Sequence, residues 1–257
     1  MEKMGICKLC GQYKKLTFEH VPPKGTFNNH PVRVVNGMET LSEERLPWDT
    51  KELKGRIQQK GKGDYYLCES CNNNTGAWYI PYYQEFVVGF FKALQGKDLS
   101  KLNGLVIKTK KIRPLPILKQ ILVMFCDINH DCFGDMKLRD FLMDKENNSY
   151  NLDRYKVYIY VFRGSVEKYM GLSGISNIKT GETKLLSEIA AYPIGQKIYV
   201  DANRDFKAYG VDITGFGKFK YDDEFEMTIQ IPILESNIIF PDDYRSKEEI
   251  VPGFKIK

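Results

Sequence analysis

The spacing of apolar residues predicts three helices in the middle of the chain. Between residues 81 and 94, apolar side chains recur every three or four positions, as on one face of an amphipathic helix. Pro81 suits the first turn of such a helix. The mostly apolar segment 117–125 predicts a buried helix, and 135–143 predicts a shorter one. These segments form the main helical part of the predicted fold.

From residue 155 onward the pattern becomes typical of strands. Residues 155–162 are β-branched or aromatic on both faces, which predicts a central strand. Further strands, separated by Gly, Asn and Asp, are predicted at 185–192, 197–201, 208–213 and 224–231. We therefore expect an α+β protein with a first module at 1–104. An accessory region at 105–257 follows, rich in antiparallel sheet from about residue 155.

Composition and charge fit a folded protein. The 257 residues are 42% hydrophobic and 28% charged, which argues against a mainly disordered chain. The net charge of +5 lies mostly in residues 1–104 and permits a polyanionic partner without requiring one. The longest apolar run, 121–126, is far too short to span a membrane, and the N-terminus carries no secretory signal. We expect a cytoplasmic protein with no membrane partner.

Four of the six cysteines form two Cys-x-x-Cys pairs, Cys7 with Cys10 and Cys68 with Cys71. Each pair can present two thiolates to one ion from a tight turn, and zinc favours four such ligands. In a chain expected in the reducing cytosol, the two pairs predict a structural zinc site. Cys126 and Cys132 lack this spacing, and we expect them to be ordinary small residues, buried or half-buried, without partners.

The segment between the two cysteine pairs is much longer than the roughly 15–20 residues of a zinc ribbon. It contains a strand-like run at 16–20 that ends in an acid and an imidazole, Glu19 and His20, before two prolines. A second short strand at 65–67 leads into the second cysteine pair. The polar residues 72–76 follow, where a short helix would begin. This insert must therefore carry more than a metal knuckle.

Taken together, Cys-x-x-Cys, Glu-His-Val-Pro-Pro and Leu-Cys-x-x-Cys-Asn-Asn resemble the HNH endonucleases over residues 5–80. Members of that family have a ββα-metal, treble-clef-like fold, and some carry a structural zinc between two knuckles. The resemblance implies an N-terminal zinc-stabilised ββα-metal module, followed by helices and a β-rich C-terminal region. It also implies a metal-dependent endonuclease that hydrolyses phosphodiester bonds in DNA, which we expect to be double-stranded.

The resemblance also assigns roles to individual residues. His20 matches the general base that takes a proton from the attacking water. Glu19 and Asn72 match the residues that hold the catalytic Mg²⁺ or Mn²⁺, and Asn73 is the alternative ligand if the register differs by one. Hard cations prefer oxygen ligands, and an imidazole titrates near neutral pH, so these residue types suit hydrolysis of a phosphodiester.

The chain departs from the family pattern at two positions. Many relatives carry Asp where this chain has Glu19, whose side chain is longer by one methylene group. The middle Asn of the motif has no counterpart, so Asp64, Gln59 or a backbone carbonyl would orient His20 instead. Cationic side chains near these residues would either contact DNA phosphates or be solvated, namely Lys54, Arg56, Lys60 and Lys62.

Two other functions remain open from the sequence. One is a non-catalytic zinc module that binds nucleic acid or protein, and the other is an RNase that uses the same site. The region 105–257 contains no motif that specifies chemistry; it would bind a protein partner or a second copy of the chain. A role in mobile elements or in bacterial defence against phage DNA is consistent with the resemblance.

Overall fold

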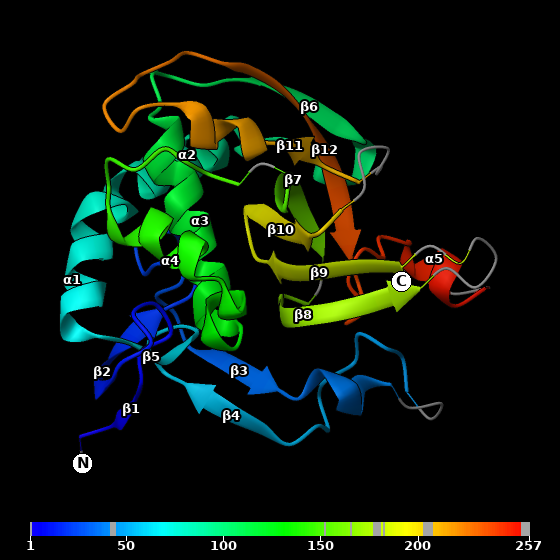
Figure 1. Ribbon diagram of the computed structural model, residues 1–257. Helices are drawn as coiled ribbons and strands as arrows, with labels where there is room; N and C mark the ends of the chain where they lie inside the picture. The colour runs from blue at the N-terminus through cyan, green and yellow to red at the C-terminus, as the bar shows by residue number, and fades with distance from the viewer. Residues whose placement is uncertain are drawn as a thin grey trace.

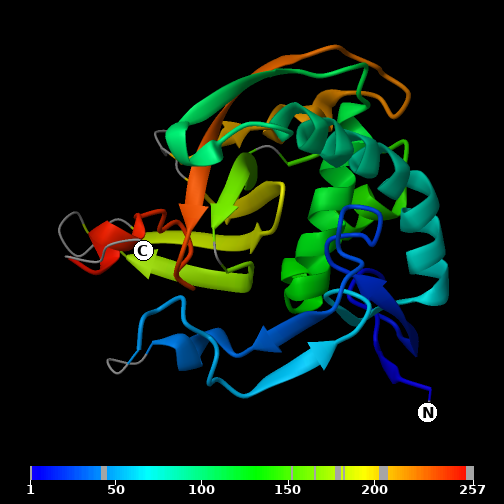
Figure 2. The ribbon, with the colours of Figure 1, turned by 180° about the vertical axis from the view of Figure 1, so that it is seen from behind.

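The computed structural model describes residues 2–252 apart from 42–44, 152, 165, 177–180, 182 and 203–207. This part of the chain contains three β-sheets and five α-helices (Figure 1). The helices are α1 (Glu69–Trp78), α2 (Ile80–Leu94), α3 (Pro114–Ile128), α4 (Met136–Met143) and α5 (Lys247–Ile250). In Figures 1 and 2, α1 to α4 gather on one side of the largest sheet, and α5 lies beyond its other end.

The largest sheet is built mainly from the second half of the chain. Its strands are β6 (Gly104–Lys108), β7 (Tyr155–Gly164), β8 (Lys168–Ser176), β9 (Thr183–Ala190), β10 (Ile194–Val200), β11 (Val211–Asp212) and β12 (Thr228–Ser236). The hydrogen-bonded order is β6-β12-β7-β10-β9-β8, and β11 also pairs with β7. Each pairing is antiparallel except that of β12 with β7. The predicted α+β fold with a largely antiparallel C-terminal sheet is therefore confirmed.

The N-terminal residues form two smaller sheets. The first is antiparallel, in the order β1-β2-β5, with strands β1 (Met4–Ile6), β2 (Tyr13–His20) and β5 (Gly63–Cys68). The second is a two-stranded ribbon of β3 (Val32–Val35) and β4 (Gly55–Gln58). The ribbon extends away from β2 and β5 towards the C-terminal side of the molecule (Figure 1). Beyond its strands, the Trp48 ring lies 5.2 Å from Lys247 Nζ, which ties the loop to α5.

One hydrophobic core joins the two predicted parts of the chain. It contains Cys7 and Leu9, the buried face of α2, most of α3 and the inner residues of β7 and β10. Helix α3 lies at its centre, since every residue from Pro114 to Asp127 is buried. A helix surrounded on all sides needs no polar face, which explains its nearly continuous apolar sequence.

The predicted helices are confirmed, with shifted ends. Segments 81–94, 117–125 and 135–143 correspond to α2, α3 and α4. Helix α3 begins earlier than predicted, at Pro114, because the first turn of a helix tolerates proline. The side chain of Asp135 caps α4 by accepting hydrogen bonds from the first free N–H groups.

The strands of the C-terminal sheet are predicted less accurately. The strand at 155–162 is confirmed as β7, but 208–213 shrinks to β11 and 224–231 is displaced to β12. The sequence does not predict β8, because Gly171 and Gly174 interrupt its alternation. The hydrogen bonds of β8 with β9 stabilise this strand although its own sequence pattern does not predict one.

The expectation that Cys126 and Cys132 have no partner is wrong. Both are fully buried as expected, but they form a disulfide bond with each other. Cys126 lies in the last turns of α3, and the following residues Asp131, Cys132 and Phe133 have positive φ angles. This left-handed turn folds the chain back on the helix and brings the two Cα atoms to 4.2 Å. The six-residue separation alone does not reveal such a turn.

Candidate metal centre and active site

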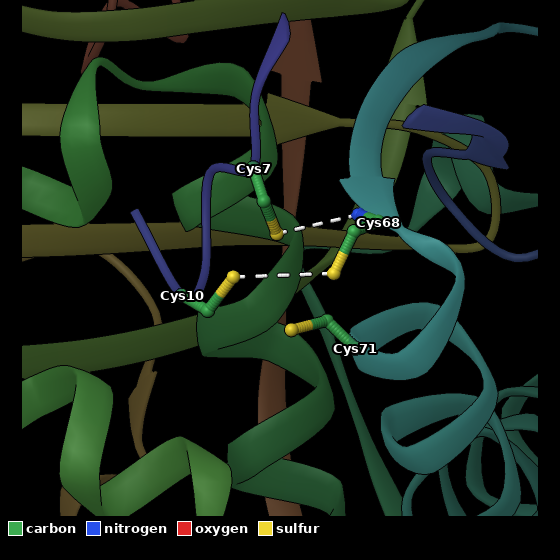
Figure 3. Close-up of side chains that lie close together, drawn as sticks. All are labelled: Cys7, Cys10, Cys68 and Cys71. Carbon is green, nitrogen blue, oxygen red and sulfur yellow. Dashed lines mark hydrogen bonds between the residues drawn. The ribbon is translucent and has the colours of Figure 1, made fainter. Parts of the chain in front are cut away.

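The two Cys-x-x-Cys pairs meet in one cluster (Figure 3). Cys7 and Cys10 lie on the turn between β1 and β2, Cys68 ends β5, and Cys71 lies at the start of α1. All four sulfur atoms lie within 4.8 Å of one another. Gly11 completes the first turn with φ of 71°, and its N–H donates to the Cys7 carbonyl at 2.9 Å. The predicted convergence of the four cysteines is confirmed, and the cluster can bind a metal ion.

Hydrogen bonds stabilise negative charge in this cluster. The Cys71 thiol and the N–H groups of Cys10 and Cys68 lower the pKa of Cys7 to about 4. The hydrogen bond with Cys7 and burial raise the pKa of Cys71 in turn. The four sulfurs therefore do not all ionise without a compensating cation, although the thiolate is the form that binds a metal. A bound cation would remove this conflict.

The pairing of β2 with β5 places the predicted site residues beside the cluster. Glu19 lies opposite Asp64, and His20 lies opposite Gly63. Helix α1 follows β5 directly, so Asn72 lies one residue after the last cysteine and near the start of the helix. Two antiparallel strands followed by a helix thus bring together residues that are about fifty positions apart in the sequence.

The structure brings Glu19 and Asn72 close together. Asn72 Nδ2 donates to Thr17 Oγ1 at 2.9 Å, and the Asn72 amide lies near enough to the Glu19 carboxyl group to act on its pKa. Glu19 is 9% exposed, and burial raises its pKa to about 7 against the opposing effect of Asn72. The pair offers a carboxyl and an amide oxygen, which are hard ligands. Asn73, the alternative ligand, is exposed.

His20 ends β2 and shares a strand face with Phe18 rather than with Glu19. Successive side chains of a strand point to opposite faces, and the rings of His20 and Phe18 meet edge to face with centroids 5.0 Å apart. The Nε2 atom of His20 lies 2.9 Å from the carbonyl oxygen of Lys60. A carbonyl only accepts, so Nε2 carries a proton, and Nδ1 of the neutral ring keeps its lone pair.

The sequence leaves open whether Asp64, Gln59 or a backbone carbonyl orients His20. The carbonyl of Lys60 makes this contact. Asp64 instead accepts a hydrogen bond from Lys3 Nζ at 3.0 Å, in an exposed ion pair. Of the three candidates, it is therefore the backbone carbonyl that contacts the His20 ring.

The turn that presents the Lys60 carbonyl is held in place by Asn28. Asn28 Nδ2 donates to the Lys62 carbonyl at 2.7 Å, and Asn28 Oδ1 accepts from the Lys62 N–H at 2.6 Å. Gly61 has φ of 99°, a conformation that side chains disfavour. A Cβ atom at this glycine would lie 2.2 Å from the Asn28 carbonyl oxygen. The turn thus accepts glycine alone at residue 61.

Sequence analysis missed one residue close to this site, Asp127 of α3. Asp127 is 1% exposed, and neither carboxyl oxygen has a hydrogen-bond partner among the described residues. Burial, the charge of Glu19 and the charge of Cys7 all raise its pKa well above the usual range. The available signal was a single acid directly after the apolar run 121–126. A buried carboxyl group without a donor calls for an explanation, and a site that can bind a cation there would supply one.

The cationic side chains near β4 and β5 differ in their surroundings. Lys54, Arg56 and Lys60 are exposed to solvent. Lys62 is half-buried, and its Nζ lies 5.1 Å from the ring centre of Tyr169 in β8. Burial lowers the pKa of Lys62. The first three side chains are free to meet a polyanion, whereas Lys62 links the N-terminal module to the large sheet.

Comparison of the chain with models of protein families, with curated proteins and with solved structures finds no match. Among the described residues, no helix combines the length and apolar character needed to cross a membrane. The candidate site is thus defined by its own geometry. It consists of a four-cysteine cluster, the buried Glu19 with the half-buried Asn72 near it, and His20 held by a backbone carbonyl.

Proposed function

We propose that this chain is a metal-dependent, HNH-type endonuclease that hydrolyses phosphodiester bonds in DNA. One observation carries the proposal. The side chain of Asn72 in α1 donates to Thr17 of β2 and lies near enough to Glu19 to lower its pKa, so the two residues that the family resemblance assigns to one catalytic cation lie close together. The general base of the same resemblance, His20, follows Glu19 directly at the end of β2.

The cysteine cluster in this proposal holds a structural zinc ion. Four sulfur ligands with mutual distances below 4.8 Å suit the tetrahedral coordination of zinc. Cys7 and Cys10 precede β2, whereas Cys68 and Cys71 flank the start of α1. An ion shared by the two pairs would fix the start of α1 against β2. Zinc would therefore hold Asn72 at its distance from Glu19 without taking part in the reaction.

The oxygen atoms of Glu19 and Asn72 would hold Mg²⁺ or Mn²⁺. The donor set fits, because both cations prefer carboxylate and amide oxygens. The carboxyl group of Asp127, which has no hydrogen-bond partner in the described part of the chain, also fits, because a carboxylate buried there would cost less beside a cation. When bound, such an ion would offset the negative charge that develops on the phosphate oxygens and on the leaving sugar oxygen.

His20 would act as the general base from the other face of the strand end. Its Nε2 proton is engaged by the Lys60 carbonyl, so Nδ1 is the atom that takes the proton from water. The scissile phosphate would lie across the end of β2, with Glu19 on one side and the attacking water on the side of His20. The exposed Lys54 and Arg56 would contact neighbouring phosphates of the DNA backbone.

The test is cleavage of supercoiled plasmid with Mg²⁺ or Mn²⁺, by wild type, His20→Ala and His30→Ala. His30 is a matched control, because it lies in the same module and its Nδ1 contacts the Phe27 carbonyl at 2.9 Å. We expect loss of cleavage in His20→Ala alone, with zinc content and folding retained. Equal nicking by His20→Ala and wild type would overturn the assignment. Structured RNA in place of plasmid tests whether the same site belongs to an RNase.

A second function is favoured by the deep burial of Glu19. Glu19 is 9% exposed and the Asn72 amide lies near its carboxyl group, as in a residue with a purely structural role. The module would then be a non-catalytic zinc domain that binds nucleic acid or protein. Binding of DNA without cleavage in the presence of either cation, by wild type and His20→Ala alike, would support this function.

A further inference from the structure

The large sheet carries a cavity of about 760 Å³ at the side remote from the cysteine cluster. Its walls come from β8, β9 and β12 and from the segment 240–249 that precedes and includes part of α5. Among the residues that line it are Ile175, Lys184, Tyr209, Leu234, Phe240 and Asp242. Its volume falls within the range of sites for small organic molecules, about 300–1,000 Å³.

A buried carboxylate, Glu188, organises the protein behind one wall of the cavity. It is fully buried and pairs with Lys168 at 3.0 Å. The hydroxyl of Tyr160 donates to Glu188 at 2.7 Å, and that of Tyr244 donates at 2.8 Å. Tyr244 also lines the cavity, so the network holds one wall rigidly.

A second carboxylate, Asp242, lies in the wall itself. It accepts hydrogen bonds from Lys197 Nζ and from the Tyr199 hydroxyl, each at 2.8 Å, and Lys184 Nζ lies at 3.9 Å. Lys197 is fully buried. Asp242 has φ of 59°, a left-handed conformation that is uncommon in residues other than glycine. Buried ion pairs rarely add stability over apolar packing. This strained, charged wall therefore points to a binding role.

The remaining wall is aromatic and accessible. Tyr209 is 61% exposed and Phe240 is 47% exposed, although large aromatic residues are usually buried. The Tyr209 ring meets that of Tyr244 edge to face at 5.6 Å, which fixes its position. Exposed aromatic rings at the wall of a cavity can stack on a planar aromatic ligand.

The charges around the cavity largely cancel. Three cations pair with three carboxylates, Lys168 with Glu188, Lys197 with Asp242, and Arg245 with Asp243. The cavity therefore presents no strong excess charge that would select a phosphate or a metal ion. Asp242, which lines it, has carboxylate lone pairs that accept from amino groups.

We propose that this cavity binds an uncharged, amino-substituted heteroaromatic ring, namely a nucleobase. The ring would stack on Tyr209 and Phe240, and its exocyclic amino group would donate to Asp242. Aromatic side chains stack on bases, and carboxylates accept from the amino groups of cytosine and adenine. A free nucleoside and a single-stranded nucleic acid present this same base chemistry.

Calorimetric titration of the full chain with cytidine, adenosine and uridine tests the proposal. Cytidine and adenosine should bind, and uridine, which carries a carbonyl group in place of the cytosine amino group, should bind about tenfold more weakly. Tyr209→Ala should weaken cytidine binding about tenfold, through the lost stacking. Tyr13→Ala, which removes another exposed ring far from the cavity, should change nothing.

Competition by a short single-stranded oligonucleotide identifies the source of the base. An oligonucleotide that displaces cytidine from wild type supports a site for single strands, and failure to displace it supports a site for free nucleosides. Absence of binding of all three nucleosides up to a Kd of about 1 mM would overturn the proposal. Binding that survives both Tyr209→Ala and Phe240→Ala unchanged would overturn it as well.

Discussion

His20 and Lys60, forty positions apart, are joined by a hydrogen bond of 2.9 Å from the imidazole Nε2 to the main-chain carbonyl. The bond connects the end of β2 to the turn before β5. Because the acceptor is a backbone group, the orientation of the ring depends on the path of the turn and not on the side chain of residue 60. Asn28 and Gly61 determine that path.

Gly61→Ala should therefore impair catalysis more than Lys60→Ala. A Cβ atom at residue 61 would lie 2.2 Å from the Asn28 carbonyl oxygen, so the turn and its carbonyl must move. We expect the cleavage rate of Gly61→Ala at saturating DNA to fall by about tenfold or more, because small misplacements of a catalytic group are costly. Lys60→Ala should lower DNA affinity without changing that rate.

Gly96→Ala provides the matched control for Gly61→Ala. Gly96 also has a left-handed backbone, with φ of 73°, but an added Cβ would meet nothing within 4 Å. The Gly96→Ala substitution therefore strains a left-handed backbone position that does not carry the Lys60 carbonyl. Equal loss of cleavage in both glycine variants would show that strain alone, and not the position of the Lys60 carbonyl, causes the effect.

Cys68→Ser should cost folding as well as metal. Cys68 lies at the junction of β5 and α1, and its N–H also donates to Cys7 Sγ at 3.3 Å. Because metal binding to such a cluster is coupled to folding, we expect a lower melting temperature together with loss of bound zinc. Metal analysis by mass spectrometry and thermal unfolding measure the two effects.

Cys126→Ser separates this effect from a general sensitivity to cysteine loss. Cys126 is buried and bonded to Cys132, and it is not one of the four clustered cysteines. It should lose stability but keep a full zinc content. A Cys68→Ser protein that remains compact and fully loaded with zinc would contradict the structural role of the cluster.

The cysteine cluster was predictable because its signal is local. Two Cys-x-x-Cys pairs define four ligands without knowledge of the insert between them. The proximity of Glu19 to Asn72 depends on the pairing of β2 with β5, and only the family resemblance indicates it in advance. The acceptor of the hydrogen bond from His20 is a main-chain carbonyl. Every residue has such a carbonyl, so the sequence does not indicate which one accepts.

Tertiary contacts explain what the sequence could not predict. Strand β8 contains two glycines and gains its order by pairing with β9. The disulfide of Cys126 with Cys132 depends on a left-handed turn. The cavity wall at Asp242 combines residues from β10 and from the segment after β12, which no local pattern connects.

Asp127→Asn should change how stability depends on pH. The raised pKa of Asp127 means that the folded chain holds this proton above the unfolded pKa of 3.8, whereas the unfolded chain has released it. Wild-type stability in cation-free buffer should therefore fall as pH rises above that value, and Asp127→Asn should lack this contribution. Urea unfolding at several pH values measures it, and Asp140→Asn, at an exposed position of α4, is the control.

The same variant tests whether a cation lies near Asp127. A ligand that binds only the folded state raises its stability, by about 2.7 kcal/mol at a hundredfold excess over Kd. Mn²⁺ should stabilise wild type more than Asp127→Asn, because Asp127 can release its proton and become a carboxylate beside a bound cation, whereas Asn cannot. Equal stabilisation of both proteins by Mn²⁺ would place the cation elsewhere.

Lys119→Met should remove a second dependence of stability on pH, of opposite sign. Lys119 Nζ is buried in α3 and donates to the Asp144 carbonyl at 2.6 Å, and burial lowers its pKa to about 7 from 10.5. Between these two values the unfolded chain binds more protons than the folded chain, so wild-type stability gains up to about 1.4 kcal/mol per pH unit as pH rises. Urea unfolding between pH 7 and 10 should show a smaller slope in Lys119→Met than in the exposed control Lys137→Met. Identical slopes would mean that Lys119 keeps an ordinary pKa in the folded protein.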